Sequence, residues 1–340
     1  MRKVLHGFAL VGAGLLGAGI TTALRPGTTT TVVAAAQPVA LVAAAKAKPK
    51  VHKIAIAPKA RQPMPRRPRA SRSLYERTMS IPVLRQQGCH AGRRQTNGVV
   101  VLDFGKLAYR RHSYGTILFS GRFARNDQIT WALKSYARGY VECLPKSSKA
   151  SITLARGTSN YNPTVPSVHR AGRKWAAETQ LLDRYLQRHG FATRVRSAAA
   201  DDVEPAWDRS FHKTHAFFAG FRAGSHGQLL YNFGSLDGGA GGIWNVRQAY
   251  YVSGGMRYAR AMPEIYNHAM ARQWAYLSRR SVHFYGKPVQ FAGLMTQHAS
   301  GCSCGLTPAE AHAALVRELS KHPQTRVVTL PAVTNIGSPS

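Results

Sequence analysis

The sequence predicts an α/β fold, a (β/α)8 barrel of the TIM type, from three observations. Beyond Gly98, short runs rich in β-branched and aromatic residues alternate with longer amphipathic runs, as in βα units around a parallel sheet. Eight short runs and six helical runs can be counted. The segment after Val99 spans about 230 residues, which suits an eight-stranded barrel. An open doubly wound parallel sheet is the alternative, because no convincing helix separates the first two strands.

The expected elements follow one another along the chain. The strands are expected at residues 99–104, 116–119, 150–155, 192–199, 228–233, 258–265, 288–295 and 326–330. The helices are expected at residues 126–144, 168–189, 210–223, 244–253, 268–278 and 308–321. Asp127 and Thr307 suit helix starts, since their side-chain oxygens can accept hydrogen bonds from the first backbone N–H groups. Thr307 is followed by Pro308 and, three residues on, by Glu310, which is typical of a capping box.

The first 36 residues have the pattern of a signal peptide. Arg2, Lys3 and His6 precede an apolar run over residues 8–24, and the small residues 33–36 offer a cleavage site. We therefore expect a secreted, extracellular or wall-associated protein. An uncleaved membrane anchor at the same apolar run is the alternative.

Residues 37–85 are expected to be a disordered basic linker, followed by the barrel domain at residues 86–335. From residue 37 to 72 the chain is mostly Ala, Pro, Lys and Arg and has no aromatic ring. The whole chain carries a formal net charge of +33, which excludes an ordinary neutral cytosolic domain. In an exported protein, this charge favours adhesion of the linker to anionic wall polymers over binding to nucleic acid.

Four cysteines permit disulfides in an exported chain. Cys89 precedes the first expected strand and Cys143 precedes the third, so both lie at the bottom of the barrel, and we expect them to be bonded. Cys302 and Cys304 follow the seventh strand at the top, where they either bond each other or stay labile. Zinc is a minor alternative, because the Cys302-Ser303-Cys304 spacing is too short for a structural zinc site. We expect no metal and no cofactor.

The acidic residues gather where a barrel carries its chemistry, at the carboxyl ends of the strands. Six of the 14 acids fall there: Asp103, Asp201, Asp202, Glu204, Asp237 and Glu264. Asp202 and Glu204 alternate along one strand, so both project to one side with Cα atoms about 6.6 Å apart. Glycoside hydrolysis uses such a pair, one carboxyl protonated and one ionised. The alternative is a solvated acidic turn, or structural ion pairs with Arg194, Arg196 and Arg209.

Aromatic and amide side chains fall near the same strand ends. Sugars match this combination, because an aromatic ring stacks on the apolar face of a pyranose while amides and carboxylates bind its hydroxyls. The alternative is that these rings cover the core. The expected substrate-binding residues are Asn160, Tyr231, Asn232, Asp237, Trp244, Glu264, Tyr266, Asn267 and Gln297.

Three short motifs carry a resemblance to a known family. Val101-Leu102-Asp103, the D-x-E of Asp202-Val203-Glu204, and Val289-Gln290-Phe291 running to Thr296-Gln297 resemble the lysozyme-type glycoside hydrolase family 25 and related secreted glycosidase-like barrels. The resemblance implies a metal-free barrel acting on peptidoglycan, with Glu204 as general acid, Asp202 as its carboxylate partner and Asp103 as a positioning acid. The further acid that the family carries near its last strand is missing here, and Glu264 is the candidate to replace it.

These observations favour a secreted protein that hydrolyses glycosidic bonds of cell-wall polysaccharide or peptidoglycan by paired carboxylate catalysis. A barrel that binds glycan without cleaving it is the first alternative. A basic, wall-associated structural protein is the second.

Overall fold

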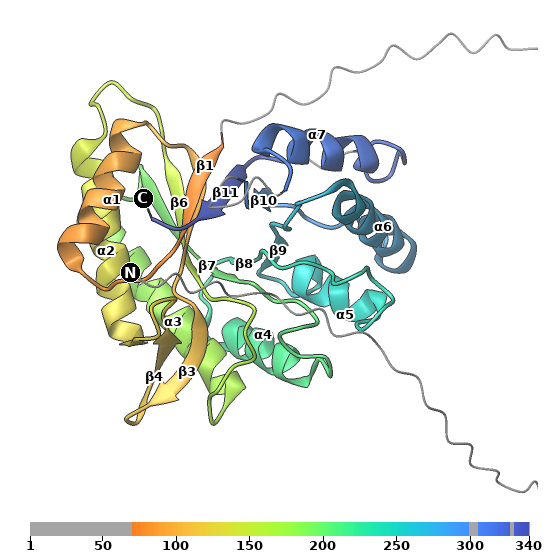
Figure 1. The fold of residues 1–340 in the computed structure, drawn as a ribbon, viewed down its shortest axis with the longest axis horizontal. Helices are drawn as coiled ribbons and strands as arrows, with labels where there is room; N and C mark the ends of the chain where they lie inside the picture. The colour runs from red at the N-terminus through yellow and green to blue at the C-terminus, as the bar shows by residue number, and fades with distance from the viewer. Residues whose placement is uncertain (1–69, 299–304, 327–329, 340) are drawn as a thin grey trace, which may run out of the picture. The chain divides into compact units, whose positions relative to one another are not determined.

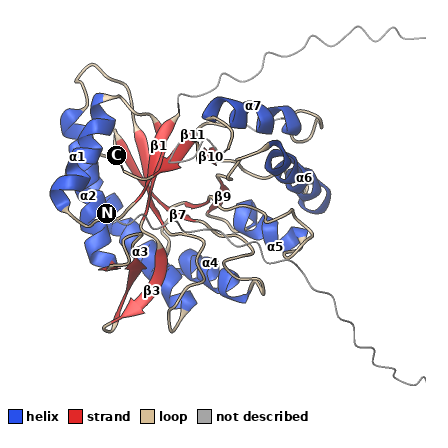
Figure 2. Cartoon of the chain, in the orientation of Figure 1, coloured by secondary structure: helices blue, strands red, loops and turns tan. Residues whose placement is uncertain are grey.

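The computed structural model describes residues 70–298, 305–326 and 330–339. Eight parallel strands form its central sheet, in the order β10-β11-β1-β2-β6-β7-β8-β9, and helices cover the outside (Figures 1 and 2). Single parallel bridges join Ala261 to Phe291 and Glu264 to Met295, which brings the edge strands β9 and β10 together. The predicted (β/α)8 barrel is therefore confirmed as a nearly closed barrel.

The elements have the following bounds. The barrel strands are β1 (Ser71–Tyr75), β2 (Gly98–Asp103), β6 (Ile152–Gly157), β7 (Val195–Asp201), β8 (Leu230–Asn232), β9 (Ala259–Ala261), β10 (Leu294–Thr296) and β11 (Val333–Gly337). The helices are α1 (Ile81–Arg93), α2 (Asn126–Cys143), α3 (Val168–Arg188), α4 (His212–Gly224), α5 (Val246–Tyr250) with a π-helical turn (Tyr251–Gly255), α6 (His268–Tyr285) and α7 (Pro308–Leu319). None of these described helices is long and apolar enough to cross a membrane.

Two expected strands are placed differently in the structure. Residues 116–119 were expected as the second barrel strand, but β4 (Ser113–Ile117) pairs antiparallel with β3 (Lys106–Arg110) and β5 (Phe123–Arg125) in a small separate sheet. Arg111 and His112 both have positive φ, as a two-residue hairpin turn between β3 and β4 requires. The last barrel strand is β11, a few residues beyond the expected 326–330, of which 327–329 lie outside the described residues.

The barrel begins earlier than the sequence analysis expected. Strand β1 and the start of α1 lie inside the range 37–85 that was assigned to the linker. β1 pairs with both β2 and β11, so it is a central strand of the barrel. The expected signal peptide, most of the linker, Cys302 and Cys304 lie outside the described residues.

Alternate residues of the strands fill the barrel interior, including Val99 and Val101 of β2 and Ala198 and Ala200 of β7. Because side chains two residues apart in a strand share a face, these rows lead to Asp103 and Asp202 at the carboxyl ends. The apolar side chains inside the barrel thus give way to carboxyl groups at the carboxyl ends of β2 and β7, which flank β6.

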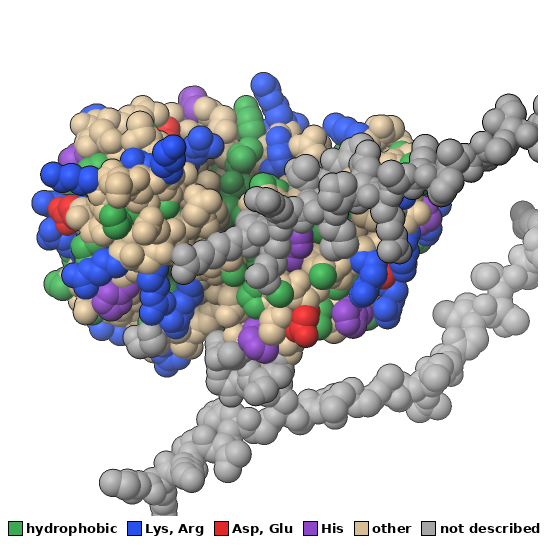
Figure 3. Space-filling model, turned by 90° about the horizontal axis from the view of Figure 1, so that it is seen from above, with side chains coloured by type: hydrophobic (Ala, Val, Ile, Leu, Met, Phe, Trp, Pro, Cys, Tyr) green, Lys and Arg blue, Asp and Glu red, His purple; other side chains and the backbone are tan. Residues whose placement is uncertain are grey.

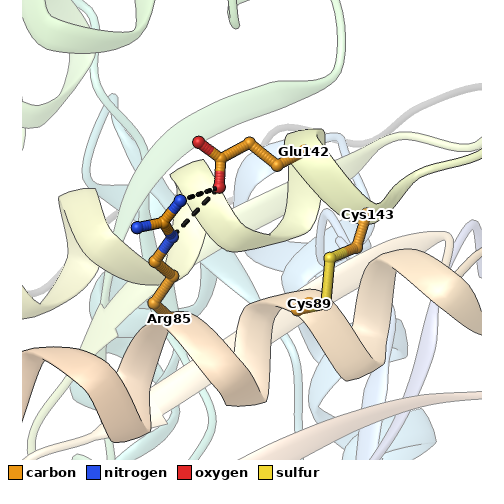
Figure 4. The surroundings of a disulfide bond; sticks show 4 residues. All are labelled: Arg85, Cys89, Glu142 and Cys143. Carbon is orange, nitrogen blue, oxygen red and sulfur yellow. Dashed lines mark hydrogen bonds and ion pairs between the residues drawn. A yellow bond between two sulfur atoms is a disulfide. The ribbon is translucent and has the colours of Figure 1, made fainter.

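The disulfide between Cys89 and Cys143 is present, with Cα atoms 4.9 Å apart, which confirms this prediction (Figure 4). It joins the C-terminal part of α1 to the last residue of α2, and the two helices pack against each other. A Cβ atom on Gly139 would lie 2.0 Å from the Arg85 carbonyl oxygen, so glycine permits this close approach. The Arg85 guanidinium also pairs with Glu142 at 2.6 Å (Figure 4).

Candidate active site

Three carboxylates converge at the carboxyl end of the barrel. One oxygen of each of Asp202, Glu204 and Glu264 lies within 4.8 Å of the others, and the three residues are only 5–7% exposed. Asp202 and Glu204 follow β7, while the Glu264–Met295 bridge holds Glu264 beside β10. The four ion pairs among the described residues do not involve these acids, which argues against structural pairing with arginine.

Glu204 is held by hydrogen bonds to both carboxylate oxygens. Its Oε1 accepts a bond of 2.6 Å from the Asn160 side-chain amide, and its Oε2 accepts from the Ser235 hydroxyl at 2.7 Å and the Ser235 backbone N–H at 3.2 Å. Burial raises the pKa of Glu204, and these hydrogen bonds oppose the rise because they stabilise the ionised form. The net shift of the Glu204 pKa is upward, and the hydrogen bonds limit it by stabilising the carboxylate.

Among the described residues, Glu264 accepts a side-chain hydrogen bond from Tyr266 alone. Burial raises its pKa to about 8, the hydrogen bond from the Tyr266 hydroxyl opposes the rise, and Glu204 and Asp103 add to it. Glu264 is therefore protonated at neutral pH.

Asp202, a member of the cluster, and Asp103 both face the barrel interior. Burial, and then the charges of Glu264 and Glu204, raise the pKa of Asp202 well above its usual value. Its Oδ1 has no hydrogen-bond partner among the described residues. Asp103 is fully buried, which raises its pKa to about 7 against the lowering effect of a 2.8 Å bond from the Gly105 N–H. Asp201, which accepts from the Thr158 hydroxyl at 2.6 Å, also has a pKa raised by burial.

Two residues at the end of β1 belong to this region and were missed by the sequence analysis. Burial raises the pKa of Tyr75, and the charges of Glu264, Asp103 and Asp202 raise it further, which places its hydroxyl near the cluster. Burial raises the pKa of Glu76 to about 7, and its backbone N–H bonds the Asp103 carbonyl oxygen at 2.7 Å. Pro82 at the start of α1 was the available signal, since it marks a helix start directly after a possible strand.

Five other expected residues lie at or near the carboxyl ends of the strands. Asn160 and Tyr266 contact Glu204 and Glu264 directly. Asn232 and Asp237 hold the neighbouring loops instead: Asn232 Oδ1 accepts from the Val203 and Gly234 N–H groups at 3.3 and 3.0 Å, and Asp237 accepts from the Ala206 N–H at 2.9 Å. Gln297 is half-buried just beyond β10.

Three expected substrate-binding residues have structural surroundings instead. Tyr231 packs within the barrel interior. Trp244 is buried, its indole N–H donates to the Asp208 carbonyl oxygen at 2.9 Å, and its ring packs on Phe211. Asn267 caps α6 by accepting from the Met270 N–H at 3.0 Å. Aromatic and amide groups at strand ends serve capping and core packing as readily as sugar binding, and sequence spacing does not distinguish these uses.

The site offers two kinds of chemistry. Buried carboxyls with different protonation states can act as acid and base on a bound substrate. Carboxylate oxygens of Asp202, Glu204 and Glu264 are also ligands of the type that hard divalent cations prefer. The three hydrogen bonds that Glu204 already accepts make its oxygens less available to a cation.

Comparisons with known proteins give a likeness to solved structures alone. No protein-family model matches the sequence, and a search of curated proteins finds no match. Among solved structures, the chain is similar to the Pseudomonas stutzeri endoglucanase Cel5A in complex with cellobiose, with a TM-score of 0.38, 11% identity and coverage of 75% of each chain. The resemblance to glycoside hydrolase family 25 is not shown by these comparisons and stays a prediction.

Proposed function

We propose that this protein hydrolyses glycosidic bonds of a polysaccharide, with Glu204 and Glu264 as the reacting carboxyls. The observation that carries the proposal is a pair of buried, closely spaced glutamates that differ in the hydrogen bonds they accept. Glu264 has a pKa of about 8, while three hydrogen bonds favour the ionised form of Glu204. Glycoside hydrolysis needs one protonated and one ionised carboxyl on either side of the scissile bond.

These contacts favour a different division of roles from the one that the family resemblance implies. We assign the general acid to Glu264 and the carboxylate to Glu204, whereas the resemblance makes Glu204 the acid. Asp202 lies beside both glutamates, and its buried Oδ1 has no hydrogen-bond partner among the described residues. Tyr161, 59% exposed and next to Asn160 in sequence, offers a ring for stacking on a sugar.

The spacing favours a retaining reaction. One oxygen of Glu204 and one of Glu264 lie within 4.8 Å, which fits the carboxyl spacing of about 5–5.5 Å in retaining enzymes better than the spacing of about 6.5–9.5 Å in inverting ones. A Glu204 oxygen forms a bond to the anomeric carbon as the glycosidic C–O bond breaks, and the Glu264 proton passes to the leaving oxygen. Water then displaces Glu204 and returns a proton to Glu264.

We further propose that the substrate is a cell-wall polysaccharide and that the protein acts outside the cytoplasm. The Cys89–Cys143 disulfide supports this, because such bonds persist mainly in oxidising compartments. The apolar run and the basic stretch before residue 70 support it at the level of sequence.

The test is to incubate the purified protein with peptidoglycan and other wall polysaccharides and to measure new reducing ends. Glu204→Ala should abolish cleavage, and added azide should restore turnover of a substrate with a good leaving group by forming a glycosyl azide of inverted configuration. Wild-type activity in Glu204→Ala would overturn the assignment. Binding of polysaccharide by the wild type without any cleavage would favour the non-catalytic glycan-binding alternative.

A further inference from the structure

A groove outside the carboxylate site lies where the β3–β4 hairpin meets α2 and α3. It consists of two adjoining cavities of about 430 and 570 Å³, and Arg170 and Lys174 line both. We call it the α3 groove. The first cavity also has Tyr109, His112 and Tyr114 from the hairpin, and the second has Arg173 and His226 but no acid.

The acids of the α3 groove are already engaged with other partners. Asp127 pairs with Arg125 at 2.9 Å. Glu178 accepts a hydrogen bond from the Thr130 hydroxyl, whose oxygen accepts another at 2.9 Å from the fully buried Arg156 guanidinium. Asp127 thus pairs with Arg125 of the same cavity, and Arg170, Arg173 and Lys174 leave the groove with more positive than negative charge.

Arg170, Arg173 and Lys174 form no ion pair among the described residues, and all three are exposed. They lie in the first two turns of α3, near the positive end of the helix dipole, where cations are unfavourable. The first turn of α3 contains no acid to offset them. Lys174 lies over the Tyr114 ring at 5.8 Å, but neither packing nor helix stability explains Arg170 and Arg173, whereas an anionic partner would.

The setting of the groove indicates what that partner is. Barrel helices begin at the carboxyl ends of the strands, so the starts of α2 and α3 lie at the same end of the barrel as the carboxylates. The segment that leads into α3 also supplies Asn160, which bonds Glu204. Tyr109 and Tyr114 line the first cavity, where their rings pack on each other with centroids 4.9 Å apart. Figure 3 shows that Lys and Arg side chains outnumber Asp and Glu on the face it presents.

We infer that the α3 groove binds a polysaccharide bearing anionic groups, and that the substrate of the neighbouring site is of this class. The sugar nature of the partner rests on the proposed function, whereas its negative charge rests on the groove alone. Arginine and lysine recognise carboxylate and phosphate groups by charge-assisted hydrogen bonds. Long-range attraction by the basic surface would also speed association.

The experiment measures binding of the full chain carrying Glu204→Gln, so that no cleavage interferes. The probes are polygalacturonate, its fully methyl-esterified form, and duplex DNA. The groove variant is Arg170→Gln with Lys174→Gln. The matched control is Arg184→Gln with Arg188→Gln, which removes the same charge from exposed positions at the far end of α3.

We expect the groove variant to bind polygalacturonate roughly tenfold more weakly than the control variant, as for the loss of two charge-assisted contacts. The methyl-esterified form should bind weakly to every variant. Equal affinities of groove and control variants for polygalacturonate would overturn the inference, and so would a selective loss confined to DNA. Absence of cleavage by the wild type would refute the proposed function but leave this binding result interpretable.

Discussion

At the residue scale, the central feature is that chemically identical side chains have different surroundings. Glu204 accepts three hydrogen bonds from neutral donors, whereas Glu264 accepts one from Tyr266 and is otherwise surrounded by acids. Although the chain has a formal charge of +33, no Lys or Arg of its described part forms an ion pair with this cluster. The cost of burying unpaired carboxyls is reduced because several of them hold protons.

This difference predicts the pH dependence of catalysis. Activity should fall above about pH 8 as Glu264 loses the proton that it donates, and the acidic limb should lie above the usual value of 4.5 for glutamic acid because the pKa of Glu204 is raised. Glu264→Gln should reduce kcat on a natural glycan by about 10²–10⁴-fold. With a substrate whose leaving group needs no protonation, the variant should stay active and lose the alkaline limb. An unchanged alkaline limb would refute the role of Glu264.

The raised pKa of Asp103 predicts how the free energy of unfolding depends on pH. Its pKa rises from 3.8 to about 7 on folding, so the native state keeps a proton that the unfolded chain releases. Its contribution to the free energy of unfolding is complete below about pH 4 and is lost as the pH rises towards 7. Asp103→Asn should therefore stabilise the protein at pH 7, by up to about 4 kcal/mol, and flatten this dependence. The amide oxygen can still accept the bond from the Gly105 N–H.

Denaturant unfolding at pH 4, 5.5 and 7 measures this effect. Asp127→Asn is the control, because ion pairing with Arg125 lowers the pKa of Asp127 and its contribution is lost as the pH falls instead. An Asp103→Asn variant that is less stable at pH 7 than at pH 4, by the same margin as the wild type, would contradict the prediction.

At the element scale, the sequence predicted the long periodic helices and the apolar strands well. Residues 126–144 and 168–189 correspond to α2 and α3 within one residue, because their apolar faces repeat at helical spacing. The strand expected at 99–104 corresponds to β2 within one residue, because it is a short continuous run of apolar residues. Strand β1 was not recognised, because its five residues follow a basic stretch and hold only two large apolar side chains.

In the candidate site too, residues whose role depends on tertiary packing could not be predicted from the sequence. The D-x-E segment was predictable, since acids at the end of a buried strand are unusual. Tyr75 and Glu76 were not, because their role depends on which strands β1 pairs with. Trp244 looked like a rim residue in the sequence, and only tertiary packing shows that its indole N–H is bonded inside the core.

The pairing of α1 with α2 predicts a large effect of the disulfide. Cys89 and Cys143 are separated by 54 residues, and closing such a loop restricts the unfolded chain by about 4 kcal/mol in the chain-entropy model. Replacing both cysteines with alanine should lower the free energy of unfolding by that order and lower Tm. Wild-type protein unfolded in a reductant should behave like the variant. Equal stability of the variant and the oxidised wild type would show that helix packing alone holds α1 to α2.

At the scale of the whole molecule, the barrel depends on a strand near its N-terminal boundary. Strand β1 lies between β11 and β2, so it joins the last strand of the chain to the second. Removing it would expose two unpaired strand edges in the middle of the sheet, where backbone groups cannot be satisfied. A barrel that lacks one strand cannot close at the same radius.

This dependence predicts where the chain can be shortened. A protein comprising residues 70–340 retains every strand in the sheet and should fold with a cooperative thermal transition like that of the full chain. A protein comprising residues 86–340, which starts at the domain boundary expected from the sequence, lacks β1 and the first residues of α1 and should fail to fold. Removing residues 1–69 also removes 12 of the 47 lysines and arginines. The 70–340 protein should therefore adhere more weakly to insoluble anionic wall material. Its hydrolysis of a small soluble substrate should be unchanged. Circular dichroism and sedimentation of both shortened proteins show whether each one folds. A folded 86–340 protein would show that β1 is dispensable.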